Sequence, residues 1–462
     1  MLKKIVVQFF IVIAVLSYTV LAYAAPINNM RFSITTDRTR IVLDSKELIR
    51  YAVEKKGLEV NINFAYSTSG KLANKLNDTV VDSAALMPTG KTSSKLQIKL
   101  KKNVKHNIFY LSNPPRLVID FPKVEITNRV EKITDGVSYR YISDVLEGKP
   151  FQAYIVTVEK NAKYEVRPFS AAGAYNGRGS LLAQSNKLGL LAAINSSYFD
   201  SDGWVIGVTK DKGKLISVED SPHSAFVVRN GVPTVIKDVA YSGFLQLNNG
   251  KQVLIKGMNR ARIADDCVIY NEAFGKSTKT NQWGREIKLK NGKVIGVSKL
   301  GDMSIEPGTI VISGHGIWAQ ALASVRPGEN LKLAQSLGIL EADQAEIVVG
   351  GGPSLIEYGS INVRSQEEHI AGDIAYGRAP RTAVGVTKSG DIMLVVVDGR
   401  STRSCGMTLK ELANFMLKLG SYSAINFDGG GSSEMVVNNR IVNKPSDGNE
   451  RLVSMGLGVF RK

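Results

Sequence analysis

Two aspartates stand where a carboxylate could do chemistry. Asp428 follows the apolar run "SAINF" and precedes three glycines and two serines, and Asp398 follows the apolar run "IMLVVV". A carboxylate at the end of a buried strand can stabilise positive charge, activate water or act as a nucleophile. The glycines after Asp428 let the backbone approach a ligand closely, with N–H groups that can point at an anion.

The residues between the two aspartates predict the element that brings them together. Thr408 and Glu411 match a capping box, an apolar stripe follows, and Gly420 is a natural helix end. Strand, helix and strand in this order predict two parallel strands in one sheet. Asp398 and Asp428 would then reach the same carboxyl edge, which is where sheets of this kind bind ligands.

A hairpin is predicted to add an arginine to this edge. In "RTAVGVTKSGDIMLVVVDGR", a two-residue Ser-Gly loop would pair Lys388 with Asp391 and place Arg381 opposite Asp398. A slip of one residue would move every side chain to the other face. A second glycine cluster, at 350–352, follows the run "AEIVV". One glycine run alone indicates a tight turn, whereas two runs with two aspartates and an arginine favour a site.

Several common sites are not indicated. The P-loop, GxGxxG and GxSxG patterns do not fit, and four histidines without HExxH spacing argue against zinc. No organic cofactor is expected. A divalent cation held by Asp398, Asp428 and backbone carbonyls stays open, because no ligand spacing requires one.

The N-terminus predicts export. Residues 1–25 combine two lysines, an apolar body and an Ala-Tyr-Ala cleavage pattern, which is typical of a signal peptide; an uncleaved membrane anchor is the alternative. After cleavage no transmembrane span is expected, so the protein would be secreted or attached to the cell envelope. The net charge of +17 fits anionic envelope polymers or simple solubility. Nucleic acid is not an expected partner, because the lysines are scattered and export separates the protein from it.

The chain is expected to hold an N-terminal all-β domain and a larger α+β domain. Short alternating strands over 26–124 predict a small β-sandwich. Residues 125–135 would form a linker, and 136–462 a mixed-sheet α+β domain. The stretches "RFSITTDRTRIVLD" and "NPPRLVIDFP" resemble the AMIN domain, a β module of exported bacterial proteins, which implies binding to the cell wall. A generic β spacer is the alternative.

The larger domain resembles the phosphodiester glycosidase family. The similar stretches include "AAINSSYF", "SGHG", "GGGPSLI", "RTAVGV", "INFDGGGSSEMVV" and "NKPSDGNER", in that order. These bacterial domains are relatives of the enzyme that uncovers mannose 6-phosphate by removing N-acetylglucosamine. The resemblance implies hydrolysis of a sugar 1-phosphodiester between the anomeric carbon and the phosphate oxygen, with a glycan or sugar phosphate as substrate.

Residue chemistry and resemblance together assign roles. The expected catalytic residues are Asp398, Asp428, Arg381 and His315, with a structural role as the alternative for the histidine. The expected substrate-binding residues are Asn195, which would bind sugar hydroxyls or orient a carboxylate, Arg400, Gly429, Gly430, Gly431, Ser432, Gly351, Gly352 and Arg451. Arg451 would reach the site or fasten the C-terminal segment. Glu434 and Glu357 are weaker carboxylate candidates, for which a surface position is favoured over the site.

Two other functions use the same residues. A lectin-like wall protein would hold phosphoglycans without cleaving them, although binding alone does not need two aspartates at one edge. A glycan transferase would use a sugar hydroxyl in place of water.

Overall fold

The computed structural model describes residues 27–35, 37–68, 70–175 and 177–462, which form two compact units that divide between Phe121 and Pro122. The expected signal peptide lies outside the described residues. Within the part described, none of the helices combines the length and apolarity that crossing a membrane requires.

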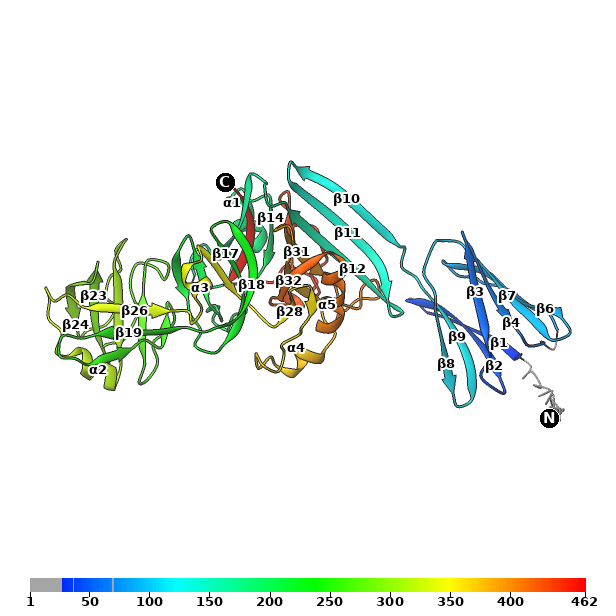
Figure 1. Ribbon diagram of the computed structural model, residues 1–462, viewed down its shortest axis with the longest axis horizontal. Coiled ribbons are helices and arrows are strands. Elements are labelled where there is room, and N and C mark those ends of the chain that lie inside the picture. The colour runs from blue at the N-terminus through cyan, green and yellow to red at the C-terminus, as the bar shows by residue number, and fades with distance from the viewer. Residues whose placement is uncertain (1–26, 36, 69, 176) are drawn as a thin grey trace, which may run out of the picture. The chain divides into compact units, whose positions relative to one another are not determined.

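The first unit is a β-sandwich, as the alternating pattern predicts (Figure 1). One sheet has the order β1 (Ile27–Ile34), β2 (Arg38–Ser45), β9 (Pro115–Pro122) and β8 (Asn107–Ser112). The other has the order β3 (Tyr51–Lys56), β4 (Glu59–Phe64), β7 (Ser93–Leu100), β6 (Val81–Gly90) and β5 (Leu72–Lys75). Alternate residues of β2, β4, β7 and β9, such as Ile41, Ile62 and Leu96, fill one core. Burial of every second side chain therefore fixes the strand register.

The second unit is built on an eight-stranded sheet, here called the central sheet. Its order is β10 (Thr127–Thr134), β11 (Val137–Leu146), β12 (Lys149–Val158), β31 (Ile392–Val397), β30 (Arg381–Thr387), β32 (Ser421–Asn426), β28 (Ser354–Glu357) and β29 (Ser360–Ile361). Residues 125–135, expected to be a linker, thus include β10, which pairs with β11.

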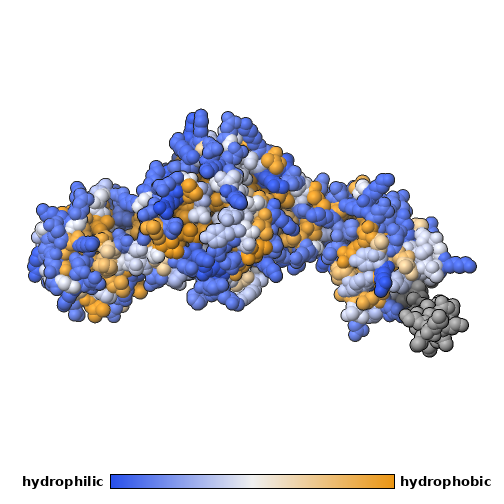
Figure 2. Space-filling model, in the orientation of Figure 1, coloured by the Kyte–Doolittle hydropathy of each residue, from blue (hydrophilic) through white to orange (hydrophobic). Residues whose placement is uncertain are grey.

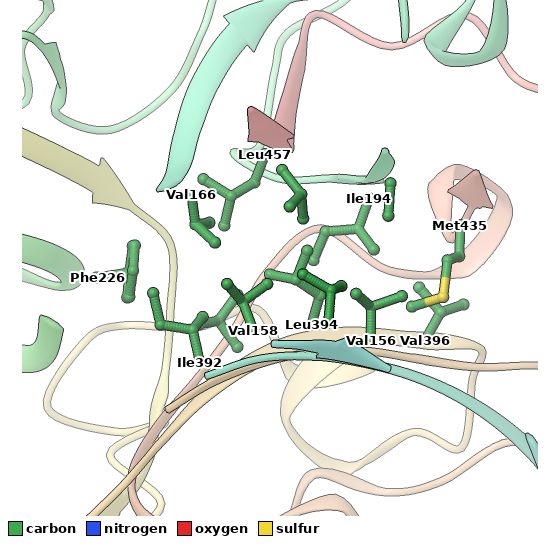
Figure 3. Close-up of a cluster of buried hydrophobic side chains, with 14 of the residues drawn as sticks. Val156, Val158, Val166, Ile194, Phe226, Ile392, Leu394, Val396, Met435 and Leu457 are labelled. Carbon is green, nitrogen blue, oxygen red and sulfur yellow. The ribbon is translucent and has the colours of Figure 1, made fainter. Parts of the chain in front are cut away.

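A second sheet, here called the packing sheet, covers one face of the central sheet. It consists of β13 (Tyr164–Ser170), β35 (Met455–Arg461), β14 (Ala192–Asn195), β33 (Met435–Val437) and β34 (Arg440–Ile441). Side chains of both sheets interlock in one buried cluster, in which Val156, Leu394 and Val396 meet Ile194 and Leu457 (Figure 3). This close packing holds the ends of β14, β31 and β32 in fixed relative positions.

Helix α5 (Leu409–Lys418) covers the other face of the central sheet. The predicted capping box is present: the Thr408 hydroxyl accepts from the Glu411 N–H, and the Glu411 carboxylate accepts from the Thr408 N–H. Leu412 and Met416 pack on the sheet with Val395. Because β30, β31 and β32 are covered on both faces, they read as continuous apolar runs rather than alternating ones.

The remaining sheets extend from this layered core (Figure 1). One contains β16 (Lys214–Ser217), β15 (Thr209–Asp211), β27 (Ile347–Gly350), β17 (His223–Arg229) and β18 (Val232–Val239). The more distant part contains β20 (Gln252–Leu254), β19 (Ser242–Gln246) and β26 (Lys332–Ser336), and also β21 (Gly257–Met258), β22 (Cys267–Tyr270), β25 (Ile310–Gly314), β23 (Arg285–Lys290) and β24 (Lys293–Ser298).

Helices are few and short in the described residues. Besides α5 they are α1 (Leu181–Lys187), α2 (Ile317–Leu322), α3 (Leu340–Gln344) and α4 (Gly372–Tyr376). The second unit is therefore mostly β-sheet, and the expected α+β class describes it only roughly. The visible surface is largely hydrophilic with apolar residues interspersed, which is ordinary for a globular chain (Figure 2).

Candidate active site

The two aspartates arrive at one edge of the central sheet, as their spacing predicts. Strand β30 lies between β31 and β32 and is antiparallel to both, so β31 and β32 run parallel to each other. The predicted register of the hairpin is wrong by one residue, because Arg381 pairs with Val397 rather than Asp398. The loop is longer than two residues: the Thr387 N–H bonds to the carbonyl of Asp391.

Asp398 is buried and surrounded by donors. Its carboxylate accepts from the Tyr154 hydroxyl at 3.0 Å, the Asn443 amide at 3.1 Å and the Lys444 N–H at 3.1 Å. Burial raises the pKa of Asp398, and the bonds from Asn443 and Tyr154 oppose that rise. These contacts attach the segment at 443–444 to the end of β31. Asp398 therefore positions the loop that follows residue 444 in the chain.

Asp428 is less enclosed and has a different electrostatic setting. Its backbone N–H donates to the Ser196 carbonyl at 3.0 Å. Burial raises the pKa of the Asp428 carboxyl to about 6, while the Ser432 hydroxyl and the Arg451 charge act in the opposite direction. The group is therefore mainly ionised at neutral pH but close to the range where it can exchange a proton.

Asn195 ties three strands together at this edge. Its amide nitrogen donates to the Asp428 carbonyl at 2.6 Å. Its oxygen accepts from the Thr382 hydroxyl at 2.7 Å and from the Glu434 N–H at 3.1 Å. Because both ends of this buried amide are used, Asn195 positions the backbone of Asp428.

Two arginines lie over the turn that follows Asp428. A side chain added at Gly430 would come within 3.2 Å of the Arg400 guanidinium, and one added at Gly431 would come within 2.0 Å of that of Arg451. Both guanidiniums are roughly half exposed, at 53% and 43%. Asp447 lies between them, 2.5 Å from Arg451 and 3.7 Å from Arg400. A carboxylate held by two exposed arginines indicates a place where an anionic ligand can bind.

Several backbone N–H groups of the turn after Asp428 already donate hydrogen bonds within the protein. The Gly430 N–H donates to the Pro380 carbonyl at 2.9 Å, and the Ser432 N–H donates to the Gly429 carbonyl at 3.1 Å. The Gly429 N–H bonds to the Asp428 carboxylate. The glycines are thus needed mainly for close approach of the arginines, and the Arg400 and Arg451 side chains offer most of the donors.

Arg381 is placed at the edge but is used internally. Its guanidinium is buried and donates to the carbonyls of Met407, Ile374 and Gly377 at 2.6–3.0 Å. Burial without a bound carboxylate lowers its pKa to about 10. Arg381 therefore fastens the segments around α4 and α5 to the site.

The N–H groups of the glycine cluster at 350–352 are all used within the fold. The three N–H groups donate to the carbonyls of Val208, Ser224 and Asn426 at 2.7–3.2 Å. An added side chain at Gly351 would come within 2.4 Å of the Phe427 ring. Because no amide of Gly350, Gly351 or Gly352 remains for a phosphate, the expected substrate contact of this run has no geometric support.

His315 follows β25 and precedes α2 in the chain. Helix α2 lies in the distant part of the second unit (Figure 1). The imidazole ring of His315 accepts from the backbone N–H of Asp265 at 3.1 Å. The backbone N–H of His315 donates to the Asp266 carbonyl. The structure thus does not bring His315 to the aspartates. In the described residues, no three His, Cys, Asp or Glu side chains gather closely enough to hold a metal ion.

The structure places further polar side chains beside the expected site residues. Ser196, Asn426 and Ser433, all from the two segments that meet at Asp428, carry buried side-chain oxygens without a hydrogen-bond partner. Tyr198 joins them through its hydroxyl, which accepts from the Asn426 amide at 3.0 Å. Unpaired buried oxygens are costly, so their concentration here indicates a place for water or a bound ligand. The sequence signal that could have identified these residues is their position within "INSSYF" and "NFDGGGSSE".

Glu434 corrects an expectation. It is 3% exposed rather than at the surface, and burial together with the nearby Glu450 raises its pKa to about 9. Glu450 in turn accepts from the Ser180 hydroxyl and the Leu182 N–H at the start of α1. Glu434 is therefore a neutral buried acid beside a second carboxyl group. Glu357, by contrast, is partly exposed and pairs with Lys237.

A β-sandwich followed by a layered β domain, with a carboxylate and two arginines at one sheet edge, defines a two-domain protein with a candidate site for an anionic ligand. Residues 284–460 match the family described as phosphodiester glycosidase, and residues 86–142 match the AMIN domain. The chain thus contains a phosphodiester glycosidase domain preceded by an AMIN domain.

Known relatives match over short stretches. The chain is 46% identical over 67 residues to the bovine (Bos taurus) N-acetylglucosamine-1-phosphodiester alpha-N-acetylglucosaminidase, which is 14% of this chain and 12% of that protein. It is 42% identical over 74 residues to the prophage-derived protein YomE of Bacillus subtilis, covering 16% and 12%. A crystal structure of a Synechocystis protein shares the fold, with a TM-score of 0.65, 21% identity and coverage of 95% of this chain and 81% of the other.

Proposed function

We propose that the protein is an exported glycosidase that hydrolyses a sugar 1-phosphodiester in envelope or extracellular glycans. The observation that carries the proposal is the placement of Asp428 directly before a turn covered by Arg400 and Arg451. The family match and the name of the bovine relative favour the same substrate class.

The arginines and the aspartate would share the work. Arg400 and Arg451 would bind the phosphodiester anion and stabilise the charge that gathers on it as the bond from the anomeric carbon breaks. Asp428, ionised at neutral pH, would face the sugar and stabilise its oxocarbenium-like transition state or receive the anomeric carbon. Water supplies the new oxygen at that carbon, and the phosphate keeps the bonding electrons and leaves as a monoester.

The surrounding residues would position these three groups. Asn195 fixes the Asp428 backbone, and Asp398 holds the segment that leads to Asp447 and Arg451. In this proposal Asp398 supports the site without touching the substrate.

A chromogenic sugar 1-phosphodiester tests the proposal. We expect wild type to release free sugar and a phosphomonoester, and Asp428→Asn and Arg451→Gln to lose that release. Asp302→Asn, an exposed change in the distant part, is the matched control. Binding without release in wild type would overturn the enzyme proposal in favour of a lectin, and products joined to an added alcohol would identify a transferase.

A further inference from the structure

The larger unit contains a cavity whose lining does not include Arg400 or Arg451. It has a volume of about 640 Å³, which lies in the range of ligand pockets. Its walls come from residues 200–206, 216–220 and 254–266, together with Tyr175. None of the catalytic or binding residues expected from the sequence lines it.

One loop connects this cavity to the candidate active site. The Ser196 carbonyl accepts from the Asp428 N–H, and the Tyr198 hydroxyl donates to the Gly352 carbonyl beside Asn426. Asp200, which lines the cavity, follows Tyr198 by two residues, so their Cα atoms are at most about 7 Å apart. The same loop therefore contributes Tyr198 to the edge of the candidate site and Asp200 to the wall of the cavity.

The C-terminal segment fixes the same loop from the other side. The Ser454 hydroxyl is buried and donates to the Gly203 carbonyl at 2.7 Å. Three residues earlier, Arg451 lies over Gly431. The loop that walls the cavity and the arginine of the proposed phosphate site are thus held by one short segment.

The charge of the cavity differs from that of the whole chain. Six of its residues are acidic and two are basic, in a chain whose net charge is +17. The acidic residues are Asp200, Asp202, Glu219, Asp220, Asp265 and Asp266. The guanidinium of Arg260 is already paired with Asp266 at 2.6 Å. This surplus of carboxylates repels a phosphate and offers acceptors for hydroxyl groups.

Apolar surface accompanies the carboxylates. Trp204 lines the cavity and stacks on Phe274 at a centroid distance of 5.4 Å, which fixes its ring plane. Ile206 and Ile263 are 44% and 65% exposed at the same place. A fixed aromatic ring beside hydroxyl acceptors matches the two kinds of surface that a sugar ring presents.

We propose that this cavity binds an uncharged sugar residue of the glycan, beyond the sugar that carries the phosphodiester. The proposal rests on the proposed function for its orientation: the phosphate lies on Arg400 and Arg451, and the neutral part of the glycan extends along residues 198–206. It makes the cavity a determinant of substrate length and charge.

Binding of N,N′-diacetylchitobiose, an uncharged disaccharide, to the full chain tests this by titration calorimetry. We expect measurable binding that weakens about tenfold in Trp204→Leu, the size of effect that a central aromatic contact produces. Trp283→Leu is the matched control, because Trp283 is 68% exposed and does not line the cavity. Asp220→Asn, an exposed change, provides a second variant that should fold normally and also weaken binding.

The outcomes separate the two proposals. No binding by wild type, or equal affinities of the Trp204→Leu and Trp283→Leu variants, would overturn the cavity proposal whatever the hydrolysis assay shows. Disaccharide binding that depends on Trp204 supports it even if no phosphodiester is cleaved, in which case only the enzyme proposal fails.

Discussion

At the scale of residues, the site is divided between groups that are enclosed and groups that remain accessible. Asp398, Arg381 and Asn195 are buried and have their polar atoms committed to neighbours. Asp428, with the arginines over the following turn, keeps contact with solvent. The accessible groups are the ones that can meet a substrate, and this division suggests where substitutions will change chemistry rather than folding.

Asp428→Asn should reduce kcat at least about a hundredfold, because the amide cannot stabilise positive charge or attack carbon. In wild type, the pKa of about 6 gives an activity that rises with pH up to that value and then levels off, since the ionised form is the active one. Initial rates between pH 4.5 and 8 check this. A profile that falls with rising pH through 6 would assign Asp428 as a proton donor instead.

Asp398→Asn should act mainly on stability. The new amide nitrogen would face N–H donors of Asn443 or Lys444, which leaves buried groups unpaired at a cost of about 1–3 kcal/mol. Thermal unfolding should show the loss, and the remaining folded protein should keep its KM. A KM that rises tenfold without a change in melting temperature would contradict this positioning role.

At the scale of elements, the two glycine clusters have different functions although they look alike in sequence. The turn at 429–431 passes beneath half-exposed arginines, whereas the turn at 350–352 packs against the core ring of Phe427. The difference depends on which segment lies opposite, and that is decided by sheet pairing far away in the chain.

A matched pair of glycine substitutions tests this difference. Gly351→Ala places a methyl group 2.4 Å from the Phe427 ring and 2.8 Å from a backbone oxygen, so it should lower the melting temperature strongly. Gly431→Ala meets the ends of Arg451 and Asp447, which can move, so the fold should persist while substrate KM rises. Equal losses of stability in the two variants would show that both turns are structural.

Local patterns predicted much of this architecture. The apolar runs of β31 and β32 and the capping box of α5 are local, and they correctly placed Asp398 and Asp428 at one edge. The hairpin register depended on loop length and was wrong by one residue. The burial of Glu434 and the hydrogen bonds of Asn195 depend on strands more than two hundred residues apart, which no local pattern reveals.

At the scale of the whole molecule, two features can be tested. The described residues form a sandwich unit and a larger unit, each with its own core. The larger unit also contains a buried acid whose titration makes stability depend on pH.

Glu434→Gln should become more stable relative to wild type as the pH rises from 5 to 8. Because the folded pKa of about 9 exceeds the ordinary 4.5, the free energy of unfolding of wild type falls as pH rises through that window. The variant lacks this titration, and its amide can donate to Glu450. The melting temperature of the variant minus that of wild type should therefore increase between pH 5 and 8. The increase should be roughly 2–4 °C for each kcal/mol of difference in the free energy of unfolding. Glu357→Gln, at a partly exposed ion pair, is the control and should show no such gain.

Residues 122–462 alone should fold and retain hydrolysis of a soluble phosphodiester, because the candidate site lies wholly within that unit. We expect the truncated protein to lose sedimentation with purified cell walls, since the AMIN domain is proposed to supply that contact. Unchanged sedimentation would assign wall binding to the larger unit and its basic surface.

In the proposed hydrolysis, the Asp447 carboxylate between Arg400 and Arg451 has a consequence for turnover. A phosphodiester carries one negative charge, but the monoester that remains after cleavage approaches two at neutral pH, so two guanidiniums alone would retain the product more tightly than the substrate. An acidic side chain held permanently among them penalises the more highly charged species. Asp447 would thus keep the affinity for the diester modest. It would also speed release of the monoester and so limit product inhibition.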